Sequence, residues 1–248
     1  MKNTLISLIK KFLKYFNLEI KKIFNPVESS IFDNKSVEIA KKYSMTSNYR
    51  LWSIVQIIKY LKEKNIDGDF VECGVWKGGN LILMKMYVDK FNLNKTIFGF
   101  DTFEGMTKPG DYDISFSNKN SIKIFKKFQT GENSSDWCNA SKEEVLSNIK
   151  KELFNNEGIY LVEGRVEETL LNEKNLPKKI SLLRLDTDFY ESTKIELEIL
   201  FPRLVKGGVL IIDDYGYWKG SKKAVDEYFE SKNLPLHYID QAARFYIK

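Results

Sequence analysis

The stretch DFVECGVWKGG, residues 69–79, decides the fold, because it runs from a short apolar strand through a glycine-rich turn directly into a helix. Glycine lets a backbone approach a ligand closely, and the first turn of a helix offers free amide donors. The spacing Gly-x-x-x-Gly-Gly from Gly74 to Gly79 differs from the Gly-x-Gly-x-x-Gly of dinucleotide sites. Taken alone, the turn is either a ligand loop that is not shaped for a pyrophosphate or a purely structural turn.

Beyond this stretch, short apolar runs rich in β-formers alternate with amphipathic helical patterns. This alternation is typical of a parallel sheet that is covered by helices on both faces. We predict strands at 69–73, 96–100, 159–162, 180–185, 208–212, 236–240 and 243–247. We predict helices at 47–64, 78–91, 142–154, 166–171, 190–203 and 220–231. The expected fold is α/β and Rossmann-like, with a seven-stranded, mostly parallel sheet.

Acidic residues follow several predicted strands, at the edge where open α/β sheets bind their ligands. Asp101 ends the second strand within FGFDTFEG, residues 98–105. A carboxylate at this place can accept hydrogen bonds from both hydroxyls of a ribose, although it could also be a helix cap or a turn residue. The glycine turn and Asp101 together indicate a ligand that contains adenosine.

Two further acidic pairs follow predicted core strands. They are Asp186 and Asp188 in LRLDTDFYEST (183–193), and Asp213 and Asp214 in LIIDDYG (210–216). Crowded carboxylates repel one another, so such a group normally needs a cation. Oxygen ligands without a nearby histidine or cysteine favour a hard ion, magnesium first and then calcium or manganese. The alternative, solvated turn residues, fits less well because both pairs directly follow apolar strands.

The composition restricts the chemistry and the class of partner. His237 is the only histidine, so mechanisms that need a histidine base have almost no material, and we expect His237 to be structural. Cys73 and Cys138 are too few for a disulfide framework and match a reducing compartment, so we expect a cytoplasmic protein. The charge of +5 arises from 39 basic and 34 acidic residues, a mixed surface that predicts no nucleic-acid partner.

Residues 1–44 form a predicted helical extension of a domain at 45–248. In residues 4–24, apolar side chains fall on one side of a helix and lysines on the other, but lysine pairs make the segment too polar to span a membrane. It either covers the domain or a second subunit, which favours a homo-oligomer, or makes a peripheral contact with the inner face of the membrane. The irregular stretch at about 104–140 predicts a lid or a substrate-binding insertion.

From about Met45 to its C-terminus, the sequence resembles the macrocin O-methyltransferase (TylF/MycF) family of metal- and S-adenosylmethionine-dependent sugar O-methyltransferases. The motifs that carry the resemblance are MTS (45–47), GDFVECGVW (68–76), FDTFEG (100–105), DTDFYEST (186–193) and GGVLIIDDYG (207–216). The resemblance implies the class I methyltransferase fold. It also implies transfer of a methyl group from S-adenosylmethionine to a hydroxyl of a small sugar or glycan-like acceptor.

The resemblance further implies roles for individual residues. The implied cofactor residues are Glu72, Gly74, Gly78, Asp101, Thr102 and Gly164, the last of which opens the stretch GRVEETL expected beside the adenine. The implied ligands of Mg²⁺, or of another hard divalent cation, are Asp186, Asp213 and Asp214. Asp186 or Asp188 would be the general base. A bound cation would lower the pKa of the acceptor hydroxyl, which is otherwise a poor nucleophile.

Three other functions fit parts of the sequence. The triplet Asp186-Thr187-Asp188 also matches the Asp-x-Asp of metal-dependent glycosyltransferases that use nucleotide sugars, although a second acidic pair joins it here. A catechol-type O-methyltransferase would use the same chelation on an aromatic ring, and the aromatic residues of the insertion, Tyr112, Phe116 and Trp137, suit either kind of ring. A non-catalytic binding module that has kept the fold is the third alternative.

Overall fold

The computed structural model describes residue 12 and residues 26–117, 119–230 and 235–248. The chain divides into two compact units, residues 1–34 and 35–248, which we describe separately. The helix predicted over residues 4–24, with its expected contact to a subunit or a membrane, lies outside the described residues apart from Phe12. Within the described part of the chain, no helix is long and apolar enough to cross a membrane.

The first unit contains the start of helix α2 (Ile31–Lys42), which the sequence patterns did not predict. The amide of Ser30 donates to the carboxylate of Asp33, and the amide of Asp33 donates to the hydroxyl of Ser30. This reciprocal pair satisfies two amides that a helix leaves without partners at its N-terminus, which explains why the helix begins at this point.

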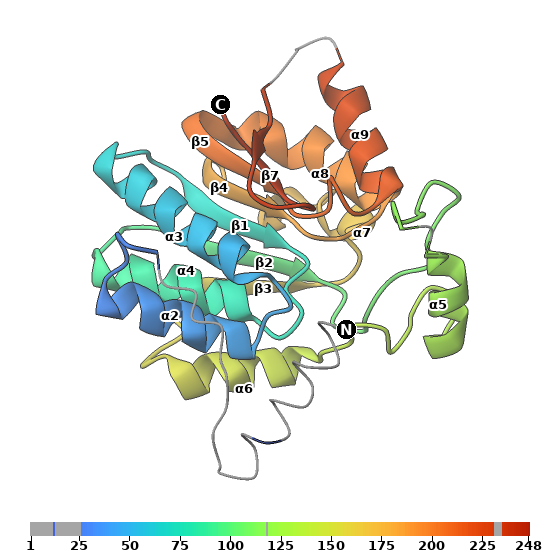
Figure 1. The fold of residues 1–248 in the computed structure, drawn as a ribbon, viewed down its shortest axis with the longest axis horizontal. Coiled ribbons are helices and arrows are strands. Elements are labelled where there is room, and N and C mark those ends of the chain that lie inside the picture. The colour runs from blue at the N-terminus through green and yellow to red at the C-terminus, as the bar shows by residue number, and fades with distance from the viewer. Residues whose placement is uncertain (1–11, 13–25, 118, 231–234) are drawn as a thin grey trace. The chain divides into compact units, whose positions relative to one another are not determined.

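A seven-stranded sheet in the order β3-β2-β1-β4-β5-β7-β6 forms the centre of the second unit (Figure 1). Its strands are β1 (Asp69–Cys73), β2 (Ile97–Asp101), β3 (Ile159–Glu163), β4 (Ile180–Leu185), β5 (Leu204–Ile212), β6 (His237–Tyr238) and β7 (Arg244–Ile247). The first five pair in parallel, and β7 runs antiparallel to both of its neighbours. Strand β4 is buried along its whole length, which explains why its apolar residues do not alternate with exposed polar ones. The predicted fold class is confirmed.

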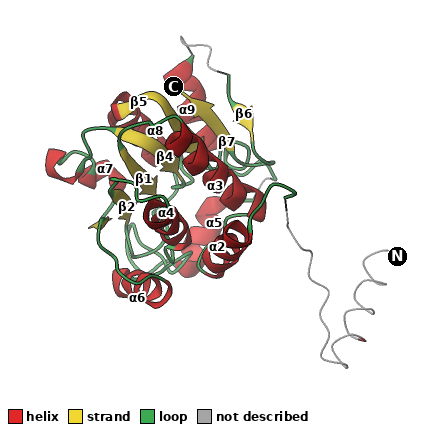
Figure 2. Ribbon diagram, turned by 90° about the vertical axis from the view of Figure 1, so that its left-hand side faces the viewer, coloured by secondary structure: helices red, strands yellow, loops and turns green. Residues whose placement is uncertain are grey.

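Helices cover both faces of this sheet (Figure 2). On one face, α3 (Asn48–Glu63) packs on β4 and β5, α4 (Gly79–Lys90) packs on β2, and α6 (Lys142–Glu152) packs on α4. On the other face, α7 (Val166–Thr169) contacts β2, α8 (Tyr190–Leu200) contacts β4, and α9 (Lys219–Phe229) packs on α8. The strand order reverses between β1 and β4, and such a reversal opens a crevice beyond the carboxyl ends of the strands.

Three boundaries differ from the prediction. The helix predicted to reach residue 203 ends at Leu200 and is followed by a 3₁₀ turn, because Pro202 has no amide hydrogen to continue an α-helix. Strand β5 therefore begins at Leu204, earlier than the predicted 208, and passes through Gly207 in a left-handed conformation with φ of 79°. The insertion predicted as irregular contains a helix, α5 (Ser121–Phe128).

Candidate active site

A cavity of about 470 Å³ lies at the crevice beyond the carboxyl ends of the parallel strands. Its walls come from the segment that leads into α3, the glycine turn after β1, the insertion, and the segments that follow β2, β3, β4 and β5. A volume in this range, roughly 300–1,000 Å³, is typical of sites for small molecules.

The glycine turn after β1 touches the acidic segment after β4 through main-chain atoms. Gly74 has φ of 84°, and a Cβ atom built on it would lie 2.1 Å from the carbonyl oxygen of Asp186. The amide of Asp186 in turn donates to the carbonyl of Cys73 over 2.9 Å. Only glycine fits at residue 74, because any side chain would push these two segments apart.

Asp101, at the end of β2, accepts hydrogen bonds from the same turn. Its Oδ2 accepts from the amides of Val75 (2.6 Å) and Trp76 (2.9 Å), and its Oδ1 accepts from the amide of Phe103 (2.9 Å). Trp76 and Phe103 both have positive φ, 46° and 53°, which are uncommon for residues with side chains. The carboxylate of Asp101 therefore holds the glycine turn in shape, in addition to facing the cavity.

The structure places the predicted cofactor residues in two groups. Four of them line the cavity, namely Gly74, Asp101, Thr102 and Gly164. Glu72 and Gly78 are not among the described residues that line it. Glu72 is fully buried and accepts hydrogen bonds from Asn80 and Arg184, and burial raises the pKa of Glu72 to about 7. Gly78 precedes α4 with φ of 87° and packs against α6.

The acidic pairs after β4 and β5 come together. Ligand oxygens of Asp186, Asp213 and Asp214 all lie within 4.8 Å of one another. Burial raises the pKa of Asp214 well above its usual range, and the charges of Asp188 and Asp213 raise it further. Burial also raises the pKa of Asp186, although the Arg184 guanidinium opposes this shift. Concentrated negative charge in a buried site attracts a cation.

Asp188 lies beside this cluster and also lines the cavity. Its backbone is left-handed, with φ of 68°, and its Oδ1 accepts a hydrogen bond of 2.6 Å from the indole Nε1 of Trp218. Burial raises the pKa of Asp188 to about 7, and the charge of Asp186 adds to this shift. A carboxyl group with such a pKa can accept a proton and release it near neutral pH.

Arg184 joins the acidic cluster to the centre of the sheet, and sequence reasoning assigned it no role. The side chain is fully buried in β4. Its Nη1 donates to Glu72 (2.6 Å) and Asp186 (2.7 Å), and its Nη2 donates to Thr46 (3.1 Å) and Asp213 (2.6 Å). One guanidinium thus bonds three carboxylates that come from β1 and from the ends of β4 and β5. An arginine inside an otherwise apolar strand was the signal that could have revealed it.

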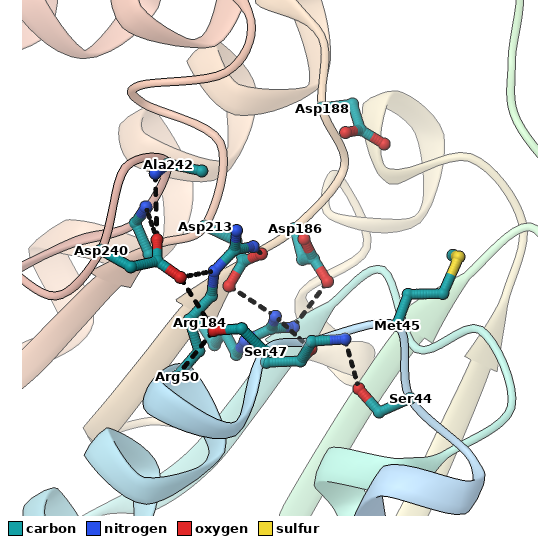
Figure 3. Close-up of polar contacts among 12 residues, drawn as sticks. Ser44, Met45, Ser47, Arg50, Arg184, Asp186, Asp188, Asp213, Asp240 and Ala242 are labelled. Atoms are coloured by element: carbon teal, nitrogen blue, oxygen red, sulfur yellow. Dashed lines mark hydrogen bonds and ion pairs between the residues drawn. The ribbon is translucent and has the colours of Figure 1, made fainter. Parts of the chain in front are cut away.

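A second arginine, Arg50 on α3, contacts the same aspartate from the side of the cavity (Figure 3). Its Nη1 donates to Asp213 Oδ2, and its Nε donates over 2.8 Å to Asp240 in the segment that leads into β7. Ser47, the N-cap of α3, also donates to Asp240 over 2.8 Å. Although burial alone would lower the pKa of Arg50, the charges of Asp213 and Asp240 raise it.

The insertion at 104–140 closes over the acidic side of the cavity. Its residue Asp113 is buried and accepts a hydrogen bond of 2.8 Å from the amide of Tyr190, at the start of α8. Residues 114–116 form hydrogen bonds with residues 217–219, before and at the start of α9. The rings of Trp137, Phe189 and Trp218 pack edge to face or at a tilt, with centroids 5.6–6.2 Å apart. These rings form an aromatic wall beside Asp188.

The acidic cluster fits a hard metal ion. Every donor is a carboxylate oxygen, and such ligands suit Mg²⁺, Ca²⁺ or Mn²⁺. Oδ2 of Asp214 is buried and has no hydrogen-bond partner among the described residues. A buried carboxylate oxygen without a partner is costly unless a ligand satisfies it. The single histidine of the chain, His237, does not belong to this cluster. It lies in edge strand β6 and stacks on Phe245.

Comparisons with known proteins agree with this geometry. The model of the family described as macrocin-O-methyltransferase (TylF) matches residues 26–248. Demethyldecarbamoylnovobiocin O-methyltransferase of Streptomyces niveus is 30% identical over 196 residues, which are 76% of this chain and 68% of the relative. A rhamnosyl-tetracenomycin-C 4'-O-methyltransferase of Streptomyces olivaceus is 28% identical over 207 residues, 82% of this chain and 75% of the relative. The solved structure of the O-methyltransferase NovP superimposes with a TM-score of 0.72 at 28% identity, over 83% of this chain and 82% of that one.

Proposed function

This chain belongs to the macrocin O-methyltransferase family and is an S-adenosylmethionine-dependent O-methyltransferase, and we propose that it methylates a sugar hydroxyl with the help of a hard divalent cation. The observation that carries the proposal is the convergence of Asp186, Asp213 and Asp214 directly beside the glycine turn. Family membership favours methyl transfer over the glycosyltransferase interpretation of residues 186–188.

The nature of the acceptor is supported by the relatives and by the cavity. The relative from Streptomyces olivaceus is named for a rhamnosyl group that it methylates at the 4' oxygen. In this chain, two rings of the aromatic wall, Trp137 and Trp218, line the cavity next to the acidic cluster, and Phe189 packs against both of them. Sugars present both an apolar C–H face and vicinal hydroxyl groups, so such a pairing of ring faces and acids suits them. A diphenol would fit by the same contacts, which makes it the alternative acceptor.

The cation would be held by Asp186, Asp213 and Asp214, with Mg²⁺ as the first candidate. When bound, such an ion lowers the pKa of a hydroxyl group that it contacts and so makes the oxygen a better nucleophile. The unpartnered Oδ2 of Asp214 supports this assignment.

Asp188 is the residue that we propose as the general base. In the reaction, a bond forms between the acceptor oxygen and the methyl carbon, the bond from that carbon to sulfur breaks, and the hydroxyl proton goes to a carboxylate. The carboxylate of Asp188 lines the cavity, and its raised pKa of about 7 favours proton uptake. Trp218 fixes its orientation through the indole N–H. Asp186 is less suited, since one of its oxygens is already bonded to Arg184.

The cofactor would lie along the glycine turn, next to Gly74, Asp101, Thr102 and Gly164. Asp101 keeps the amides of Val75 and Trp76 in place, so the turn does not need to be reorganised when a ligand binds. The insertion supplies part of the cavity wall through residues 105–107, 137 and 138, and it would reduce the access of water to a bound substrate.

The test is incubation of the full chain with labelled S-adenosylmethionine and Mg²⁺ and with a panel of nucleotide sugars, glycans and diphenols, followed by mass spectrometry. We expect one sugar-containing acceptor to gain a methyl group, and EDTA to abolish the gain. An Asp213→Ala, Asp214→Ala double variant should bind S-adenosylmethionine as the parent does but lose transfer. Full transfer by this variant in EDTA would contradict the metal mechanism, and methylation of diphenols alone would contradict the sugar assignment.

A further inference from the structure

Asp213 is held by two arginines that differ in how firmly each is fixed (Figure 3). Its Oδ1 accepts from Nη2 of Arg184, and its Oδ2 accepts from Nη1 of Arg50. Both oxygens of a carboxylate that the proposed function assigns to a metal are thus already engaged by cationic side chains. An ion that binds Asp213 must therefore share the carboxylate with these two groups or displace one of them.

Arg184 cannot leave its position. Its side chain has no exposed surface, and both of its Nη atoms are bonded to groups on other segments of the core. If Arg184 withdrew from Asp213, Glu72 and Asp186 would remain buried without their cation, which is strongly unfavourable. Arg184 therefore fixes the position of the aspartates and does not compete with a metal ion for them.

Arg50 is placed differently. Its side chain is 20% exposed and lines the cavity, so Nη1 approaches Asp213 from the side that a metal would also use. The other end of its guanidinium is bonded through Nε to Asp240. Asp240 is itself fixed, because it accepts hydrogen bonds from the amides of Ala242 and Ala243 and from the hydroxyl of Ser47. Arg50 thus has a second, permanent anionic partner outside the acidic cluster.

From this arrangement we infer that Arg50 is an internal counter-ion that competes with the divalent cation for Asp213, and that Asp240 retains Arg50 when the metal is bound. The inference rests on the proposed function, since it presupposes a metal at Asp186, Asp213 and Asp214. Without the metal, Arg50 offsets the repulsion within the acidic cluster. With the metal, Nη1 gives up Asp213 while Nε stays on Asp240. The pair of Arg50 and Asp240 thereby sets the metal affinity.

Binding of Mn²⁺ tests the role of Arg50. It is measured on the full chain without S-adenosylmethionine, from the electron paramagnetic resonance signal of free Mn²⁺. Arg50→Met removes the competitor and should tighten Mn²⁺ binding about tenfold, the size expected for one nearby charge at a partly buried site. Arg50→Lys keeps the charge but not the fork that bridges two carboxylates, and should change the affinity less. The melting temperature gives a second measurement. Arg50→Met should lower it in EDTA, where Arg50 offsets the repulsion within the acidic cluster, and should not lower it in saturating Mn²⁺.

Arg165→Met is the matched control, because Arg165 also lines the cavity but pairs with Glu167 and Glu168 instead of the acidic cluster. Its removal subtracts the same charge from the same cavity and should leave the Mn²⁺ affinity within about twofold, since exposed charges are well screened. An equal gain in Mn²⁺ affinity for Arg165→Met and Arg50→Met would overturn the inference. The gain would then come from the loss of one positive charge anywhere in the cavity and not from the release of Asp213.

Asp240→Asn tests the second partner. Asn keeps an oxygen for the amides of Ala242 and Ala243 but no longer attracts Arg50, which should then bind Asp213 more completely and weaken Mn²⁺ binding about fivefold. In the Arg50→Met background the same substitution should have a clearly smaller effect. Equal effects in both backgrounds would overturn the inference, as would an unchanged or weaker affinity in a folded Arg50→Met variant.

The failure of this inference can be told from the failure of the proposed function. If the parent protein binds Mn²⁺ and Arg50→Met binds it equally, only the role of Arg50 is wrong. If the parent protein binds no more Mn²⁺ than the Asp213→Ala, Asp214→Ala double variant, the metal site itself is wrong, and the role of Arg50 falls with it.

Discussion

The two sides of the cavity hold their key carboxylates in different ways. On the glycine-turn side, Asp101 is bonded to the backbone amides of Val75, Trp76 and Phe103. On the acidic side, Asp213 is bonded to the side chains of Arg184 and Arg50. Amides belong to the main chain and stay where the fold puts them, and Arg184 is fixed by burial, whereas the partly exposed side chain of Arg50 can be displaced by another cation.

A preformed site and an adjustable site can therefore share one cavity. The glycine turn needs no external ion to satisfy Asp101, so its shape is set when the chain folds. The acidic cluster carries more negative charge than its two arginines offset, and it retains a buried oxygen without a partner, on Asp214. Its final arrangement is therefore expected to depend on what binds there, and four substitutions test this contrast.

The largest effect is expected from Arg184→Met, which would leave the buried carboxylates of Glu72, Asp186 and Asp213 without their shared cation. We expect the free energy of unfolding to fall by about 3–5 kcal/mol, as when one partner of a buried ion pair is removed. Urea denaturation measures it. The matched control is Arg203→Met, whose partner Glu173 is largely exposed, and which should cost less than about 1 kcal/mol. Similar losses of stability for the two variants would contradict the expectation that the buried guanidinium of Arg184 stabilises the fold more than an arginine with an exposed partner.

The next effect concerns Glu196, a fully buried carboxyl group with neither amides nor an arginine beside it. Its hydrogen-bond partners are the hydroxyl of Thr187 and the thiol of Cys73, and burial raises the pKa of Glu196 from 4.5 to about 8. The native state then keeps a proton that the unfolded state releases, so stability is lost as the pH rises from about 4.5 to about 8. We expect Glu196 to account for a loss of about 2 kcal/mol between pH 6 and pH 8, so Glu196→Gln should reduce the parental loss by that amount, as urea unfolding at both pH values would show.

Glu163→Gln, which changes an exposed glutamate at the end of β3, is the control for this pH dependence. It should keep the parental slope of stability against pH. The same slope in the Glu196→Gln variant would mean that Glu196 is ionised in the folded protein, and would contradict its expected neutral state.

A smaller and more local effect is expected from Asp101→Asn. The amide group of asparagine cannot accept at both positions, so at least one backbone donor of the turn loses its partner. We expect S-adenosylmethionine to bind about tenfold more weakly by calorimetry, whereas Mn²⁺ affinity should stay within about twofold. Parallel losses of both affinities would mean that the two sides of the cavity are not independent.

The smallest effect is expected from Thr46→Val, which removes one of the four acceptors of Arg184 and changes almost no volume. Loss of this buried hydrogen bond to a charged donor, together with the longer one of 3.4 Å from Asn80, should lower the free energy of unfolding by about 1 kcal/mol. Differential scanning calorimetry would detect it as a shift of a few degrees. A loss as large as that of Arg184→Met would show that Thr46, rather than the carboxylates, anchors the guanidinium.

The sequence indicated the parallel sheet, the glycine turn and the four aspartates after β4 and β5, because apolar runs and strand ends are local patterns. It did not reveal the two arginines that hold the aspartates. Arg184 interrupts an apolar strand, and Arg50 lies on a helix where an arginine usually faces solvent. Apart from Asp186, the carboxylate partners of the two arginines lie far away along the chain, at 72 and 213 for Arg184 and at 213 and 240 for Arg50.

The placement of Glu72 could not be predicted from the sequence for a related reason. A strand presents alternate residues to opposite faces of the sheet. The motif alone did not tell whether the side chain of Glu72 would reach the cavity or lie in the buried interior. The presence of Arg184 on the neighbouring strand decides this, since Glu72 and Arg184 are paired in register between β1 and β4. The helix α5 escaped prediction because its apolar face is short and half of its residues are exposed.

The main-chain contact between Gly74 and Asp186 separates what can vary in this enzyme from what cannot. Because peptide groups alone make that contact, no exchange of side chains in the insertion at 104–140 alters the spacing between donor and acid sites. Substitutions in the insertion can therefore change the groups that face the cavity, while the spacing between the glycine turn and the acidic segment remains set by the backbone.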